Sequence, residues 1–209
     1  MEINSTEEQQ VEAIKKFFKE NGTSIVFGVV FGTAGMFGWR AYNDSVIQAQ
    51  EASSDGYTQL LAQANNESVD IVAEAQQYID GNKDSGYAVL AALFAAKQAV
   101  EDAKLDEAEK QLTFAATSAQ NDSLKAIALI RLSRILIEQN KYDMATTELA
   151  KVKPEAFKSR VAELRGDIAL KQGDSAKARE QYQLAIDAQE EPVNTNLQQK
   201  FDDLAGASA

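Results

Sequence analysis

The sequence predicts an all-α protein in which one membrane-spanning helix precedes a domain of stacked helix pairs. Its composition is dominated by Ala, Leu, Gln, Lys and Glu and includes two prolines, at 154 and 192, which is typical of helical chains. A stretch without charged residues lies near the N-terminus, and similar turn signals recur after it. With 209 residues, the chain has room for one sizeable domain and an anchor.

The candidate membrane segment is the uncharged stretch at residues 21–39. As a helix it would be about 28 Å long, close to the roughly 30 Å thickness of a bilayer's hydrocarbon core. A buried core helix and a cleaved signal peptide are the alternatives, but the stretch exceeds a typical signal core and no small-x-small cleavage site precedes Arg40. We therefore expect a retained anchor over residues 21–42, with Trp39 and Tyr42 at the membrane interface.

The positive charges beside the anchor predict its orientation. Lys15, Lys16 and Lys19 precede the segment, whereas Arg40 is the nearby basic residue that follows it. Because positive residues concentrate on the cytoplasmic side, we expect residues 1–20 to be cytoplasmic and residues 43–209 to form a domain across the membrane. In a Gram-negative bacterium that space is the periplasm.

Two further patterns lie in or beside the anchor. Residues 8–20 place apolar side chains on one helical face beside the lysines, which predicts an amphipathic helix lying at the interface or continuing the membrane helix. Gly28, Gly32 and Gly35 form a small-residue strip that would let another helix approach closely. Glycine is also common in membrane helices for other reasons, so both explanations of the strip stay open.

Three turn signals after the anchor predict a repeat. They are residues 104–108 (KLDEA), 141–145 (KYDMA) and 174–178 (DSAKA), and their final alanines are 37 and 33 residues apart. These spacings bracket the 34-residue tetratricopeptide period. Small residues fall at matching offsets, as at Gly166 and Ala178, where paired helices must approach closely. An irregular bundle with accidental spacing is the alternative.

The predicted domain at 43–209 is therefore a tetratricopeptide-like solenoid of helical hairpins. Its expected pairs are 86–102 with 105–119, 123–139 with 142–152, and 155–172 with 175–188, after a degenerate pair at 44–64 and 68–80 and before a short covering helix at 195–204. In such repeats the first helix of each pair lines a concave groove. This register nominates a partner-binding set comprising Leu90, Leu93, Lys97, Val100, Ile127, Ile130, Arg134 and Ile137.

The groove would suit an extended or helical peptide, with Arg134 or Arg160 orienting a carboxylate. The third pair places Arg160, Glu163, Asp167 and Leu170 at the same positions, so the groove becomes more polar toward the C-terminus. Alternatively, residues 44–80 fold into the groove and make it core. An exposed patch of six large aliphatic side chains would be unusual on a monomer.

Composition argues against enzymatic chemistry. The chain has no His and no Cys, which removes the usual zinc ligands and the commonest general base. Phosphate-binding and redox motifs are also absent from the sequence. Residues 43–209 carry 17 basic and 27 acidic groups, and a surface this negative repels nucleic acid. We expect no catalytic residues, metal or cofactor, and protein partners instead.

Several segments in order resemble the YfgM family, the ancillary subunits of the SecYEG translocon. They are residues 11–18 (VEAIKKFF), the anchor end at 38–40 (GWR), residues 87–92 (YAVLAA) and residues 162–167 (AELRGD). The resemblance implies a single-pass inner-membrane protein with a periplasmic tetratricopeptide-like domain. It also implies association with SecYEG and the periplasmic chaperone PpiD, helping to hand over exported polypeptides. A structural scaffold for another cell-envelope complex is the alternative function.

Overall fold

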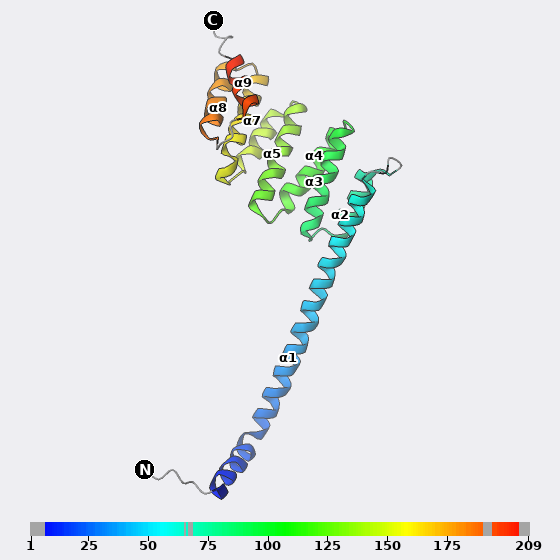
Figure 1. Ribbon diagram of the computed structural model, residues 1–209, viewed down its shortest axis with the longest axis vertical. Coiled ribbons are helices and arrows are strands. Elements are labelled where there is room, and N and C mark those ends of the chain that lie inside the picture. Colours follow the sequence, from blue (N-terminus) through cyan, green and yellow to red (C-terminus); the bar gives the residue numbers. More distant parts are fainter. Residues whose placement is uncertain (1–6, 65, 67–68, 190–193, 205–209) are drawn as a thin grey trace, which may run out of the picture. The chain divides into compact units, whose positions relative to one another are not determined.

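The computed structural model describes residues 7–64, 66, 69–189 and 194–204. This part of the chain is helical and contains no strand, so the all-α prediction is confirmed (Figure 1). The chain divides into two units, residues 1–52 and 53–209. Its elements are α1 (Glu7–Gln63), α2 (Ile71–Gly81), α3 (Gly86–Glu101), α4 (Leu105–Ser118), α5 (Asp122–Glu138), α6 (Tyr142–Ala150), η1 (Glu155–Phe157), α7 (Lys158–Lys171), α8 (Ser175–Asp187) and α9 (Thr195–Asp203).

The first unit consists, in its described part, of helix α1, which then continues into the second unit. The helix runs without a break through residues 8–20 and 44–63. The separate helix expected at 44–64 is therefore wrong, and residues 8–20 continue the apolar helix as one of the two alternatives proposed. No turn or proline interrupts the backbone hydrogen bonding here, so nothing ends the helix at either expected boundary.

The apolar part of α1 has the surface expected of a membrane span. The apolar side chains between Val26 and Trp39 are exposed, and no residue of the anchor at 21–42 is buried. A core helix of a soluble domain would instead bury such side chains. The Thr33 hydroxyl donates to the carbonyl of Val29 at 2.8 Å, which satisfies a polar group that lipid could not.

The second unit contains the three predicted helix pairs, α3–α4, α5–α6 and α7–α8. Each pair turns at a residue with positive φ: Ala103 at 57°, Asn140 at 59° and Gly173 at 83°. The amide of the following residue donates to a carbonyl five positions earlier in each case, at 2.7 to 2.9 Å, which is the Schellman closure of a helix C-terminus. The turn geometry therefore repeats in the register that the sequence predicted.

Small residues bring the two helices of each pair together. The small residues at matching offsets are buried in all three pairs: Ala96 and Ala108, Ser133 and Ala145, and Gly166 and Ala178. In the third pair, a Cβ added at Gly166 would lie 2.4 Å from a ring carbon of Tyr182 and 3.2 Å from the carbonyl oxygen of Ala178. Gly166 is therefore required by the fully buried tyrosine opposite it.

Residues 53–81 pack at the start of the repeat stack. The Tyr78 hydroxyl donates to the carbonyl of Ser53 at 2.6 Å, and the Ser53 hydroxyl donates to Ser85 at 2.7 Å. The Gln76 side chain accepts a hydrogen bond from the buried Gln111 of α4 at 2.8 Å. These contacts match the degenerate first pair, although its second helix begins at Ile71 and the predicted start at 68 lies outside the described residues.

We predict that Gly166→Ala destabilises the repeat domain by about 1–3 kcal/mol, because overpacking a filled contact forces the Tyr182 ring to move. Urea unfolding of the full chain in detergent micelles, followed by circular dichroism, measures the change. Gly81→Ala is the matched control, since a Cβ there meets nothing within 4 Å. Equal midpoints for the two variants would show that the third pair has room that the packing does not indicate.

Candidate partner-binding site

The nominated groove positions divide into two rows on the first helices of the repeats. The first row contains the first nominated residue of each helix and the residue seven positions after it. Its members are at least partly exposed: Leu90 and Lys97 on α3, and Ile127 and Arg134 on α5. The position three residues after the start is buried, since Leu93 is 8% and Ile130 6% exposed. The first row can therefore meet a partner without rearrangement of the domain, whereas Leu93 and Ile130 cannot.

The rows separate because of helix geometry. At about 100° per residue, positions three apart lie roughly 60° from each other around the axis, whereas positions seven apart differ by only about 20°. The sequence register treated both rows as one face. Leu93, Ile130 and Ile137 instead belong to the main hydrophobic core, which corrects the prediction that they line an open groove. Val100, in the last turn of α3, remains 43% exposed.

We call Leu90, Lys97, Ile127 and Arg134 the exposed ridge. Lys97 forms an ion pair with Glu101 one turn away at 3.5 Å, an exposed contact that leaves its ammonium accessible to water. Residues 53–81 contact α3 and α4 instead. The Tyr57 ring lies 5.7 Å from the ring of Tyr87 in α3, and Gln76 is hydrogen-bonded to Gln111 of α4. Ile127 and Arg134 on α5 keep partly exposed side chains.

Arg134 lies in a crowded electrostatic environment. Its pKa is lowered by partial burial and then by the positive charges of Arg160 and Arg131, against the opposing effect of Glu163 and Asp167. A guanidinium remains charged despite such a shift. The side chain is therefore a charged, partly desolvated donor suited to binding a carboxylate.

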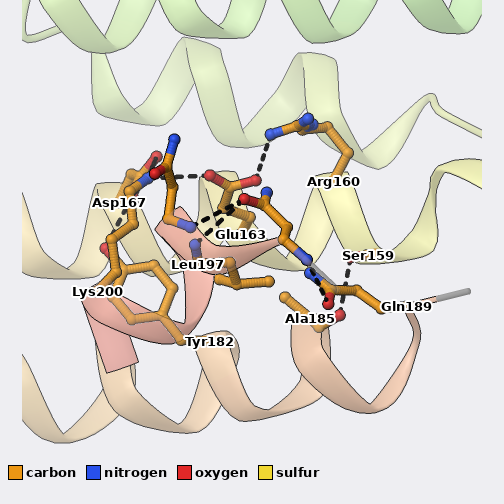
Figure 2. A network of polar contacts seen from close by, with 11 residues as sticks. Ser159, Arg160, Glu163, Asp167, Tyr182, Ala185, Gln189, Leu197 and Lys200 are labelled. Carbon is orange, nitrogen blue, oxygen red and sulfur yellow. Dashed lines mark hydrogen bonds and ion pairs between the residues drawn. The ribbon is translucent and has the colours of Figure 1, made fainter. Parts of the chain in front are cut away.

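The third pair carries a polar network that sequence reasoning missed (Figure 2). Glu163, 6% exposed, accepts hydrogen bonds from Arg160 on its own helix and from Lys200 of α9, the latter at 3.0 Å. Lys200 also donates to Asp167 at 2.7 Å, and Asp167 accepts a bond from the Tyr182 hydroxyl at 2.8 Å. Two carboxylates, two cations and a phenol thus meet between α7, α8 and α9.

One sequence signal could have revealed this network. Glu163 occupies the same register position as Leu93 and Ile130, where the other repeats bury an aliphatic side chain. A carboxylate at a core position needs a cation, because an unpaired buried charge is strongly destabilising. The identity of that cation was beyond prediction, since Lys200 lies 37 residues away along the chain.

The network raises the pKa values of Tyr182 and Lys200. Burial raises the pKa of the Tyr182 phenol, as do its hydrogen bond to Asp167 and the charges of Asp167 and Glu163. Burial disfavours the ammonium of Lys200, but its hydrogen bond to Asp167 and the nearby carboxylates outweigh that effect and raise its pKa. Both groups therefore hold their protons more tightly in the folded chain.

The described residues contain no group of three metal-ligating side chains. A shallow depression of about 250 Å³ lies at the start of α5 and is lined in part by Lys125, Lys151 and Lys153. Lys151 in it is engaged by Glu148 at 2.7 Å. In the membrane segment, a Cβ added at Gly28, Gly32 or Gly35 would meet no atom within 4 Å. The clearest arrangement for recognition in this part of the chain is therefore the ridge of apolar and cationic side chains.

The fold and the ridge define a class: a membrane protein with one spanning helix and a helical-repeat domain suited to binding other proteins. The family model of the tetratricopeptide repeat-like domain matches residues 15–206. Three relatives are each named "Ancillary SecYEG translocon subunit". The protein from Escherichia coli (strain K12) is 31% identical over 95% of this chain and 96% of its own length. The protein from Haemophilus influenzae is 32% identical over 88% and 91%, and that from Aggregatibacter actinomycetemcomitans is 34% identical over 86% and 88%.

The chain belongs to this family of ancillary SecYEG translocon subunits. Together with the exposed apolar helix, membership makes it a single-pass inner-membrane protein. Its members carry a tetratricopeptide repeat-like domain, which is a protein-interaction module, and they are not a known family of enzymes.

We predict that the repeat domain loses stability as the pH rises above about 10. The pKa values of Tyr182 and Lys200 are raised on folding, so their contribution is complete below their unfolded pKa values and is lost as the pH rises from those values through the higher folded ones. Urea unfolding at several pH values measures the slope. Tyr182→Phe should show a shallower decline than the control Tyr142→Phe, and identical slopes would contradict the assignment.

Proposed function

We propose that this chain is a membrane-anchored protein-binding module that works at the Sec translocon and helps to transfer exported polypeptides to periplasmic chaperones. The exposed ridge is the observation that carries the proposal, since it presents apolar and cationic side chains on the first helices of two adjacent repeats. The names of the relatives support the translocon as the place of action. SecYEG, the chaperone PpiD and exported chains are the proposed partners.

The chemistry of the ridge defines the segment that it binds. Leu90 and Ile127 offer aliphatic surface, while Lys97 and Arg134 offer cations about two helical turns further along α3 and α5. Burial of apolar groups supplies affinity, and a guanidinium orients a carboxylate through paired hydrogen bonds. The fitting partner is an extended or helical segment with aliphatic residues followed by an acidic group.

Photo-crosslinking in native membranes tests this binding site. A photoreactive residue at Lys97 or Ile127 should yield adducts with channel subunits, a chaperone or an exported chain, because these positions lie on the exposed ridge. Thr117, exposed on the second helix α4, is the control position. Arg134→Ala should weaken the adducts at Ile127, whereas Arg165→Ala, which removes an exposed arginine of α7, should not.

Each crosslinking outcome distinguishes one function from another. Adducts with envelope proteins other than translocon components, and copurification without channel subunits, would contradict translocon action and favour a scaffold. Equal adducts from Thr117 and the ridge would contradict the ridge as the binding site. Adducts confined to residues 44–80 of the same chain would show that the ridge is occupied internally.

We also propose that the N-terminus lies in the cytoplasm and that residues 43–209 lie in the periplasm, with residues 21–42 as the anchor. The three lysines before the span and the single nearby arginine after it support this orientation. We further propose that Gly28, Gly32 and Gly35 allow another membrane helix to approach closely, because in the described part of the chain a Cβ added at any of them would meet no atom within 4 Å.

Cysteine labelling tests the orientation, and the chain is suitable because it has no native cysteine. Lys177→Cys should react with a membrane-impermeant maleimide in intact spheroplasts, whereas Glu12→Cys should react only after lysis. Both side chains are exposed, so labelling after lysis confirms that each thiol can react. The reverse pattern in intact cells would invert the proposed topology.

A further inference from the structure

Helix α9 covers a surface of the last helix pair. Leu197 is fully buried and Leu204 is 8% exposed, and both join Ala178, Tyr182 and Ala185 in a small core that is separate from the main one. Phe201 also packs there, with the guanidinium of Arg179 4.7 Å from its ring centre. The helix is thus seated on α7 and α8 by one apolar face.

The surface under α9 combines an apolar floor with two carboxylates. Its floor is the Tyr182 ring, and its acidic edge is formed by Glu163 and Asp167, which both bind Lys200 (Figure 2). The Lys200 ammonium also lies 5.7 Å from the centre of the Tyr182 ring. We call Glu163, Asp167, Arg179 and Tyr182 the cradle. In this structure the cradle binds one lysine and the apolar residues that share a helical face with it, and this pattern defines its specificity.

Part of the cradle is held by contacts within α7 and α8 alone. Arg160 would still bind Glu163, and the Tyr182 hydroxyl would still donate to Asp167, because these partners lie on α7 and α8. Removal of Lys200 therefore takes one cation from the carboxylates without leaving either of them unpartnered. A surface that keeps its geometry when its occupant leaves can bind another occupant of the same chemistry.

Helix α9 has little helical stability of its own. It has nine residues, fewer than an isolated helix needs to be stable in water, so it depends on its contacts with the cradle. Its ion pairs use a Lys200 side chain that is 36% exposed, where salt screens the interaction. Short peripheral elements of this kind open locally at lower free energy than the core.

We propose that the cradle is a second protein-binding site, occupied in the resting chain by α9 and open to an amphipathic helix of a partner protein that carries a lysine beside its apolar face. Residues 197–204 give the recognition pattern, Leu-x-x-Lys-Phe-x-x-Leu, with contacts at positions i, i+3, i+4 and i+7. The partner displaces α9 and places its own lysine between Glu163 and Asp167. This site selects a cation, whereas the exposed ridge selects a carboxylate, so the two sites bind different segments.

A labelled peptide with the sequence of residues 194–204 tests the proposal on the full chain in detergent micelles. Fluorescence anisotropy should show the peptide binding at least about tenfold more tightly to Lys200→Gln than to the unmodified chain, because a weaker resident leaves the cradle open more often. Lys177→Gln, which removes an exposed lysine of α8, should bind like the unmodified chain. A peptide whose lysine is replaced by glutamate should not bind.

Three further variants make the result specific. Leu204→Ala loosens α9 and keeps every charge, so it should also increase peptide binding if Lys200→Gln proves poorly folded. Glu163→Gln combined with Asp167→Asn should abolish binding. Lys97→Ala removes a cation of the exposed ridge whose ion pair is with Glu101 of α3, and it should leave binding unchanged, which separates this site from the proposed translocon function.

Hydrogen exchange supplies the second readout. In Lys200→Gln and Leu204→Ala, amides of residues 196–203 should exchange faster while α7 and α8 keep their protection. Loss of protection in α8 together with α9 would show that α9 is a permanent part of the repeat, and it would overturn the proposal. Absence of saturable peptide binding to both loosened variants would overturn it as well.

Discussion

The close approach of paired helices is the constraint on which the rest of the domain depends. Each pair meets at small residues, Ala96 with Ala108, Ser133 with Ala145, and Gly166 with Ala178, and all six positions are buried. Such contacts fix how each hairpin folds and therefore which face of its first helix is covered. In the third pair the Tyr182 ring takes the space that a Cβ at Gly166 would need. That ring then becomes the floor of the surface on which α9 lies.

Much of this fold could be predicted because its determinants are local. The turn residues at 103, 140 and 173 repeat with the spacing of the sequence signals, and α3 to α9 lie close to their predicted ranges. The continuous α1 was harder to predict, since a change from apolar to polar composition marks a change of surroundings and not a helix end. Residues 44–63 remained helical because no breaker separates them from the anchor.

The candidate site was predicted only in part, for a geometric reason. A seven-residue register identifies neighbouring positions along a helix, but it does not say where the boundary between buried and exposed sides falls. Leu93 and Ile130 lie on the buried side of that boundary, and Leu90 and Ile127 lie on the partly exposed side. Hydrophobicity could not separate them, because all four are large aliphatic residues. The contact of Lys200 with Glu163 joins distant segments, and such pairings have no signal in local periodicity.

The register position of Leu93, Ile130 and Glu163 thus has two different roles along the solenoid. In the first two repeats an aliphatic side chain at this position contributes to the main core. In the third repeat Glu163 introduces a charge, and packing alone would disfavour that substitution because desolvation of a carboxylate is costly. The cost is offset only if cations reach the site, and the chain supplies two, one from α7 and one from α9. An aliphatic residue here would have packed without any cation, so the charge of Glu163 makes the packing of the third repeat depend on Lys200 of α9.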